Sequence, residues 1–189
     1  WSSLNLLTKR RYDALREQFG SLDAAWGPRD SPLLRPLGCK EETMHRVLGE
    51  MRNMRAEKME QELTQRGIRF LTIEDAEYPD LLRTLPDPPI FLFAKGDIRL
   101  LQQPAIAIVG TRDMSPYGKR VTEALVLDFV AAGLVTVSGL AIGIDAQVAR
   151  ETLSAGGRTI AGLGHGLGMI FPRGNAHLAE EIIEKGGLL

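Results

Sequence analysis

Three short apolar runs divide the second half of the chain at regular intervals. They cover residues 105–109, 134–137 and 159–163, and each runs into a turn that is rich in glycine. A short continuous apolar run is typical of a buried parallel strand, and glycine suits a tight turn or a close approach of ligand to backbone. The pattern therefore predicts three buried parallel strands whose carboxyl ends meet at one edge of a sheet.

Helical patterns separate these runs and follow the last of them. Ser115-Pro116 is typical of an N-cap followed by the first helical residue, and that helix is expected to end at Gly133. Two more helices are expected over about 143–156 and 176–185. This strand–helix alternation predicts an α/β fold with an extended Rossmann-like parallel sheet flanked by helices.

The first third of the chain shows helix-like spacing without strand signals. Apolar residues recur at helical spacing from Leu4 to Phe19, and Ser21 is placed to cap a short helix after them. A single long charged helix is expected over about 41–66, with Gly67 at its end.

The chain is thus expected to divide into three parts. We predict a small all-helical domain over 1–68, a linking segment that joins the Rossmann sheet over 69–104, and a Rossmann-like domain over 105–189. The chain starts at Trp1 and stops in a strand-like Leu188-Leu189 pair, which indicates a piece of a longer protein.

Composition removes several classes of function. The net charge of −1 gives no bulk attraction for nucleic acid, although a local basic site is compatible with it. Cys39 is the only cysteine, so neither a disulfide framework nor a thiolate metal site is expected. No apolar run approaches the about 18 residues of a membrane span, and no signal-peptide pattern is present. These features favour a cytoplasmic protein without a membrane partner.

The first turn, Gly110-Thr111-Arg112, offers chemistry suited to phosphate. Gly110 lets the chain turn, Thr111 adds a hydroxyl and an amide, and the guanidinium of Arg112 matches phosphate oxygens. The alternative is a plain strand end that carries a surface arginine.

The second turn is more specific. Ser138, Gly139 and Gly143 are small enough to let a backbone approach an anion at a helix start. Asp145 lies in the first turn of that helix, where it either braces the helix start and the loop amides or acts in catalysis. Bracing is the favoured interpretation.

The third loop adds a second arginine. Gly164 and His165 lie in the glycine-rich stretch after the last strand, and Arg173 and Asn175 follow it. We interpret Arg173 as a second phosphate clamp rather than a solvated charge, and Asn175 as the cap of the following helix. No acid or base lies near His165 in sequence, so catalysis by His165 is disfavoured.

Standard catalytic motifs are absent from the sequence. There is no G-x-G-x-x-G after the first strand, no P-loop, no H-x-x-x-H and no G-x-S-x-G. A site rich in phosphate donors but without an acid–base pair indicates a binding site, so no catalytic residue, metal or cofactor is predicted.

A series of motifs resembles the DNA processing protein A family (DprA, also called Smf). In chain order the matching pieces are Tyr78-Pro79-Asp80-Leu81-Leu82, Pro88-Pro89, Leu92-Phe93-Ala94-Lys95-Gly96, the run 106–112, Pro116-Tyr117-Gly118, residues 137–145, residues 155–159, and Pro172 with Asn175. The N-terminal part is similar to the SAM-like or helix-hairpin-helix-like domain that many members carry.

The resemblance implies a non-catalytic protein that binds single-stranded DNA, protects it, and helps to load the RecA recombinase in natural transformation. It also implies a homodimer. Arg112 and Arg173 would contact DNA phosphates, while Gly110, Ser138, Gly139 and Gly143 would line the pocket with donors. Asp145, Gly164, His165 and Asn175 would support that pocket.

The chain departs from the family pattern at several points. Ile142 stands where arginine or another polar residue is common, Gly168 where aspartate is usual, and His165 where a small residue or cysteine is found. A later F-P-x-R-N-R-I-I segment is absent. Two alternatives stay open: a Rossmann enzyme such as a nucleotide phosphoribohydrolase, and an interaction module whose glycines only make turns. The lack of a paired acid and base counts against the enzyme, and three glycine turns with two arginines on one sheet edge count against the module.

Overall fold

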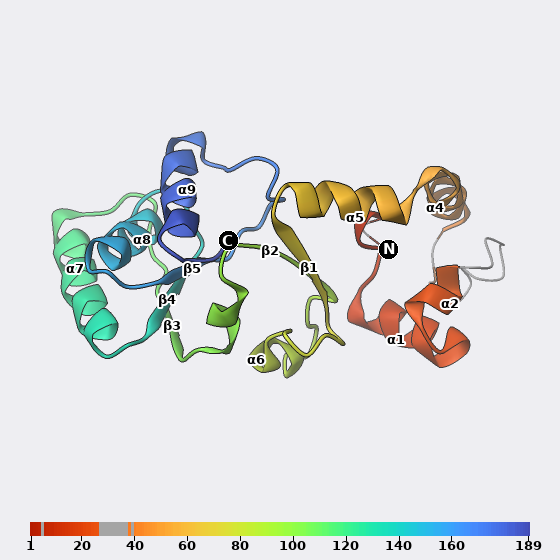
Figure 1. The fold of residues 1–189 in the computed structure, drawn as a ribbon, viewed down its shortest axis with the longest axis horizontal. Helices are drawn as coiled ribbons and strands as arrows, with labels where there is room; N and C mark the ends of the chain where they lie inside the picture. The colour runs from red at the N-terminus through yellow and green to blue at the C-terminus, as the bar shows by residue number, and fades with distance from the viewer. Residues whose placement is uncertain (5, 27–37, 39) are drawn as a thin grey trace. The chain divides into compact units, whose positions relative to one another are not determined.

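The computed structural model describes residues 1–4, 6–26, 38 and 40–189 (Figure 1). Cys39 lies outside the described residues. The chain folds as two compact units: one comprises Trp1–Gln65 and Thr72–Leu92, and the other comprises Arg66–Leu71 and Phe93–Leu189. Among the described helices, none is both long and apolar enough to cross a membrane.

Helices dominate the first unit. They are α1 (Lys9–Phe19), α2 (Leu22–Trp26), α4 (Glu41–Asn53), α5 (Ala56–Gln65) and the short α6 (Asp80–Arg83). Residues of α1, α2 and α4 and of the segment before α1 form a buried core, which consists of Leu4, Leu6, Leu15, Ala25, Val47 and Met51. The predicted Ser21 cap is confirmed, because its hydroxyl oxygen accepts from the Ala24 amide at 3.0 Å. The SAM-like identity of this unit stays a prediction.

Two helix predictions in this unit are wrong. Helical spacing from Leu4 is interrupted, since α1 begins only at Lys9 after the Thr8 N-cap. The single helix expected over 41–66 is broken at Met54, which is extended with φ −73° and ψ 141°. The Arg55 guanidinium lies 3.2 Å from the Met54 carbonyl oxygen and so helps to satisfy the end of α4.

The second unit is built on a parallel sheet. Its strands β3 (Ala105–Ala107), β4 (Val135–Ser138) and β5 (Thr159–Ala161) lie in that order. Ile106 is opposite Thr136, and Val137 is opposite Ile160. The predicted α/β class with a parallel sheet flanked by helices is confirmed.

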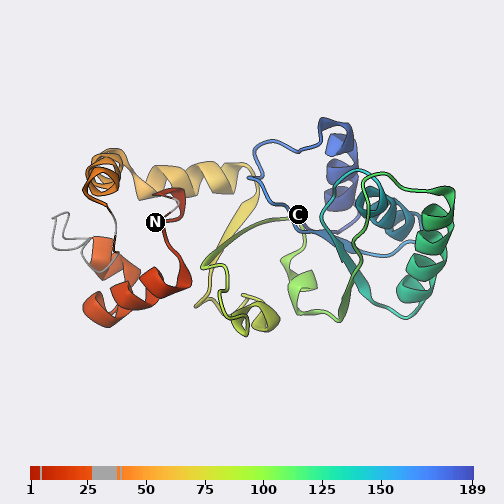
Figure 2. The ribbon, with the colours of Figure 1, turned by 180° about the vertical axis from the view of Figure 1, so that it is seen from behind.

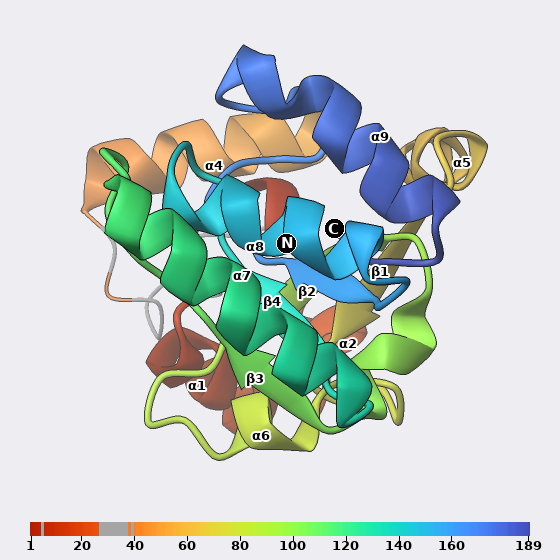
Figure 3. The same cartoon turned by 90° about the vertical axis from the view of Figure 1, so that its left-hand side faces the viewer.

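Helices α7 (Pro116–Ala131) and α8 (Ile144–Ser154) pack on this sheet (Figure 3). Ser115 caps α7 as predicted, with its hydroxyl oxygen accepting from the Gly118 amide at 3.1 Å. Val126, Ile144 and Val148 form a buried cluster between the two helices. This packing fixes the start of α8 next to the turn that follows β3.

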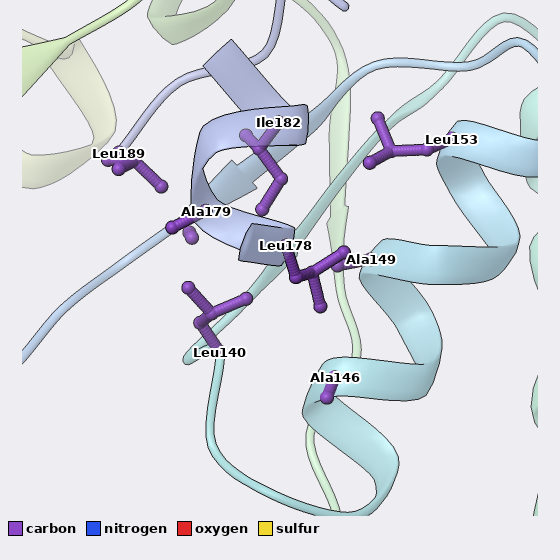
Figure 4. Packing of buried hydrophobic residues seen from close by; sticks show 9 residues of the cluster. Leu140, Ala146, Ala149, Leu153, Leu178, Ala179, Ile182 and Leu189 are labelled. Atoms are coloured by element: carbon purple, nitrogen blue, oxygen red, sulfur yellow. The ribbon is translucent and has the colours of Figure 1, made fainter. Parts of the chain in front are cut away.

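Helix α9 (Ala176–Glu184) completes the largest apolar cluster of the unit (Figure 4). Leu178 and Ile182 of α9 meet Ala149 and Leu153 of α8, and Leu140 lies beside them. The loop that carries Leu140 is therefore anchored by the same cluster that seats α9.

The C-terminal residues extend the sheet. Leu188 pairs in parallel with Ile160 and antiparallel with Gly96. Lys95 and Leu189 exchange two backbone hydrogen bonds of 3.0 and 2.9 Å. This segment therefore lies between β5 and β2 (Phe91–Lys95), which itself pairs with β1 (Ile68–Thr72).

The prediction that residues 105–109 form a buried strand is wrong. Strand β3 stops at Ala107 and pairs only with β4 among the described residues, so it is an edge strand. Val109 lies beyond the end of this strand and is 75% exposed. An apolar run does not distinguish a central strand from an edge strand, because that depends on which neighbours pair with it.

Candidate functional site

The carboxylate of Asp145 joins the first two turns of the sheet edge. Its Oδ1 accepts from the Gly110 amide at 3.3 Å, and its Oδ2 accepts from the Gly139 amide at 3.1 Å. The residue is only 7% exposed. Asp145 thus braces both turns from the start of α8, and its two oxygens are occupied by protein donors.

Other donors of these turns are also engaged within the protein. The Ser138 hydroxyl donates to the Ile108 carbonyl at 2.8 Å, which ties β4 to the end of β3. The Ile144 amide donates to the Thr111 carbonyl at 3.1 Å. A hydroxyl or amide donates its hydrogen once at full strength, so Ser138, Gly110 and Gly139 hold the turns together in this structure. Their predicted role as phosphate donors stays a prediction.

Two glycines are required by this close packing. Gly143 has φ +86°, and a Cβ there would lie 2.6 Å from the Arg112 carbonyl oxygen. A Cβ on Gly110 would lie 2.7 Å from the Cβ of Ile144. The start of α8 can therefore approach the 110–112 turn only because both positions lack a side chain.

Asn175 joins the third loop to the second turn. Its side-chain amide donates to the Leu140 carbonyl at 2.9 Å, and it is only 4% exposed. Although Asn175 stands at the N-cap position of α9, its side chain makes no capping hydrogen bond. The predicted helix-capping role is therefore wrong. Leu140 has φ +57°, an unusual conformation for a branched residue, and this bond helps to hold it.

Arg112 projects from the braced turn and is exposed. It forms no ion pair with any residue that the structure describes. Thr111 is exposed beside it, and its hydroxyl oxygen accepts from the Asp113 amide at 3.1 Å, which leaves the hydroxyl hydrogen available. The turn thus presents a guanidinium and a hydroxyl donor on a rigid base.

Arg173 lies in the 3-10 turn Arg173–Asn175 that leads into α9, and it is also exposed. Within the described part of the chain it has no carboxylate partner. Because Asn175 is anchored to Leu140, Arg173 is held two residues from a fixed point. The structure therefore places Arg112 and Arg173 on loops that follow the carboxyl ends of β3 and β5.

His165 serves the third loop internally. Its Nε2 lies 3.2 Å from the Phe171 amide nitrogen, and its Nδ1 lies 3.1 Å from the Gly166 carbonyl oxygen. Nε2 also lies 3.1 Å from the Phe171 carbonyl oxygen, and which ring nitrogen donates depends on the tautomer. Gly164 is exposed, with no atom within 4 Å of an added Cβ. His165 thus closes the loop that separates β5 from Arg173.

The sequence did not mark Arg66 as a residue of this site, although its side chain lies near this loop. The Arg66 Nη1 atom lies 3.9 Å from the position of a Cβ on Gly168. No signal in the local sequence joins these residues, because the contact depends on the path of the loop after β5.

The arrangement is better suited to holding an anion than to moving protons. In the described residues, no three His, Cys, Asp or Glu side chains form a group that could hold a metal ion. The buried carboxylate of Asp145 and the ring of His165 are bound to backbone groups. The exposed guanidinium groups of Arg112 and Arg173 remain, and the guanidinium group as a class is suited to phosphate or carboxylate oxygens.

Comparison with known proteins identifies related chains. Residues 69–189 match the family model described as DNA recombination-mediator protein A. The chain is 35% identical to the Smf protein of Synechocystis sp. over 193 residues, which is 100% of this chain and 48% of that protein. It is 41% identical to the DNA processing protein DprA of Bacillus subtilis over 126 residues, which is 66% of this chain and 42% of that protein. The chain thus spans about half the length of these curated relatives or less.

Two solved structures share the fold. The X-ray structure of DNA processing protein A from Streptococcus pneumoniae matches with a TM-score of 0.77 and 28% identity, over 99% of this chain and 64% of that one. The Helicobacter pylori protein, described for its unique single-stranded DNA binding mode, matches with a TM-score of 0.55 and 33% identity, over 64% of this chain and 54% of that one.

Proposed function

The chain belongs to the DNA recombination-mediator protein A family, and we propose that it binds single-stranded DNA through the phosphates at the carboxyl edge of the β3–β4–β5 sheet. The main observation in support of this proposal is that the Arg112 side chain is exposed, and unpaired among the described residues, on a well-braced turn. Its turn is braced by Asp145 and fitted against Gly143, and its guanidinium is exposed without an ion-pair partner among the described residues.

Arg173 supplies a second cation to the same strand of DNA. Both arginines follow strand ends of one parallel sheet, which is where open α/β folds bind ligands. Neither base recognition nor a bulk positive charge is required, because neutralising phosphates gives sequence-independent affinity. The net charge of −1 is therefore compatible with DNA binding, provided that the local cations are unpaired.

The biological role we propose follows the family. The chain would protect incoming single strands and assist the loading of RecA in natural transformation, as a cytoplasmic homodimer without catalytic activity. The family description names a recombination mediator, and the H. pylori relative is described as binding single-stranded DNA. These similarities support the proposal.

A nucleotide phosphoribohydrolase is the alternative that we consider weaker. Such an enzyme needs an acid–base group that faces its substrate. The oxygens of Asp145 face the amides of Gly110 and Gly139, and the ring of His165 faces the backbone of its own loop. Release of a free base from a nucleoside monophosphate would favour the enzyme instead.

Fluorescence anisotropy with a labelled oligo-dT strand across a salt series tests the proposal. Each phosphate neutralised on a single strand contributes about 0.7 to the slope of log affinity against log salt. Arg112→Gln and Arg173→Gln should each flatten the slope by about that amount. Arg158→Gln removes one positive charge at the amino edge of the sheet, because Arg158 precedes β5, and it serves as the off-site control. Unlike Arg112, Arg158 lies 3.5 Å from the Asp97 carboxylate, so the stability of this variant is measured alongside its binding.

Two outcomes would reject DNA binding at this edge. One is a wild-type protein that ignores the oligonucleotide at low salt. The other is an Arg112→Gln protein that binds as the Arg158→Gln protein does.

A further inference from the structure

The loop between β5 and α9 reaches a cation from a distant part of the sequence. In Figures 1 and 2 this loop, drawn in blue, runs out to the start of β1 before it returns to α9. There the Arg66 Nη1 atom lies 3.9 Å from where a Cβ on Gly168 would be. Arg66 and the loop belong to the same compact unit.

Arg66, like Arg112, is an exposed cation without an ion-pair partner among the described residues. Gly168 itself carries no carboxylate, and apart from its chain neighbours, Nη1 of Arg66 is the only atom of the described residues within 4 Å of a Cβ added there. The guanidinium is therefore available to an external anion.

The loop exposes its backbone at two glycines. Gly164 and Gly166 have no atom within 4 Å of an added Cβ, so the backbone is open at these positions. His165 fixes the shape of the loop through its contacts with Phe171 and Gly166. An extended polyanion could thus lie along the loop between Arg173, at its C-terminal end, and Arg66, near Gly168.

We propose that Arg66 is a further phosphate-binding residue, which lengthens the single-stranded DNA site beyond Arg112 and Arg173 along the glycine loop. This inference rests on the proposed function. The ligand group is a backbone phosphate of the same strand, so the contact adds affinity and salt dependence but no preference among bases.

A substitution at Gly168 can test the role of Arg66 specifically. Gly168 has an ordinary φ, so a side chain is tolerated there. An aspartate at this position would bring a carboxylate oxygen to the about 2.7–2.9 Å that is typical of a charge-assisted hydrogen bond with Arg66. Gly168→Asp should therefore neutralise Arg66 without removing it. Gly166→Asp adds the same charge at a position where no atom of the described residues lies within 4 Å of an added Cβ.

The experiment is an oligo-dT anisotropy titration across a salt series with the whole chain. Arg66→Gln should flatten the slope by about 0.7 and weaken binding on the order of threefold at the low-salt end. Gly168→Asp should weaken binding more in the wild-type background than in the Arg66→Gln background. Gly166→Asp should have the same effect in both backgrounds.

The outcomes separate this inference from the proposed function. If the wild type binds and Arg112→Gln weakens it, but Arg66→Gln binds like the wild type at every salt concentration, the role of Arg66 is wrong and the function stands. A wild type that does not bind overturns both. Circular dichroism and thermal melting of each variant verify the fold. Should Gly168→Asp fail to fold, Arg66→Gln alone decides.

Discussion

The side-chain nitrogen of Asn175 lies 2.9 Å from the carbonyl oxygen of Leu140, and this hydrogen bond joins the third loop of the sheet edge to the second. The two residues are 35 positions apart. Since Arg173 is two residues from Asn175, the bond also fixes the base from which that arginine projects. The backbone position of the exposed Arg173 thus depends on a buried side-chain amide two residues away.

Substitutions of Asn175 can distinguish its hydrogen bond to the Leu140 carbonyl from a helix-capping role. Serine is as good an N-cap as asparagine, but its shorter side chain would not reach the Leu140 carbonyl. We expect both Asn175→Ser and Asn175→Ala to destabilise the chain by about 1–3 kcal/mol, the cost of leaving a buried carbonyl without a partner. Urea denaturation measures the change. A fully stable Asn175→Ser protein would show that capping is what matters.

Elements marked by local chemistry could be predicted from sequence. Ser115-Pro116 marks the start of α7, and the left-handed Gly67 and Gly133 follow α5 and α7 as expected of helix-ending glycines. Such signals lie within a few residues of the feature that they determine. The helix break at Met54 has neither glycine nor proline, and the helical spacing of apolar residues continues across it. The break could therefore not be predicted from sequence.

The site was predictable to a lesser degree. Sequence located the turns around Gly110, Gly139 and Gly143, but it treated their amides as donors for a ligand. Which donors stay free depends on tertiary hydrogen bonds, such as those that Asp145 accepts from two turns. Arg66 escaped notice for the same reason, because only the folded loop brings Gly168 to it.

Asp145 provides a test of the bracing itself. In Asp145→Asn one side-chain atom becomes a donor, so only one of the Gly110 and Gly139 amides can keep its acceptor. We expect a loss of about 1–3 kcal/mol in the free energy of unfolding. Asp113→Asn, at an exposed carboxylate of the same edge, should change stability by less than about 0.5 kcal/mol. Equal denaturation midpoints for the two variants would argue against a brace at Asp145.

Asp97 gives the fold a pH dependence in acid. Hydrogen bonds from the Arg99 guanidinium lower the pKa of the Asp97 carboxyl to about 2. A carboxyl whose pKa is lower in the folded state stabilises the fold above its unfolded pKa, and this contribution is lost as the pH falls through the folded value. The stability difference between wild type and Asp97→Asn should therefore be full above about pH 4 and shrink toward pH 2. Urea midpoints of both proteins at several pH values measure it, and a difference that stays constant over this range would contradict the assignment.

Gly143→Ala tests whether the fit of α8 against the first turn controls Arg112. Alanine would have to adopt φ +86° and place a Cβ 2.6 Å from the Arg112 carbonyl oxygen. The strained backbone alone costs about 1–3 kcal/mol, and relief of the clash must move either the turn or the helix. Thermal melting should therefore show a destabilised protein. Gly164→Ala is the matched control, since Gly164 has an ordinary φ and no atom within 4 Å of an added Cβ.

The same variant links stability to binding. If the turn is the part that moves, Gly143→Ala should weaken oligo-dT binding at temperatures where the protein is still folded, and its salt slope should approach that of Arg112→Gln. The double variant Gly143→Ala/Arg112→Gln should then bind no more weakly than Arg112→Gln alone, because both changes act through one guanidinium. Additive losses would instead mean that Gly143 contributes to DNA binding by a route independent of Arg112.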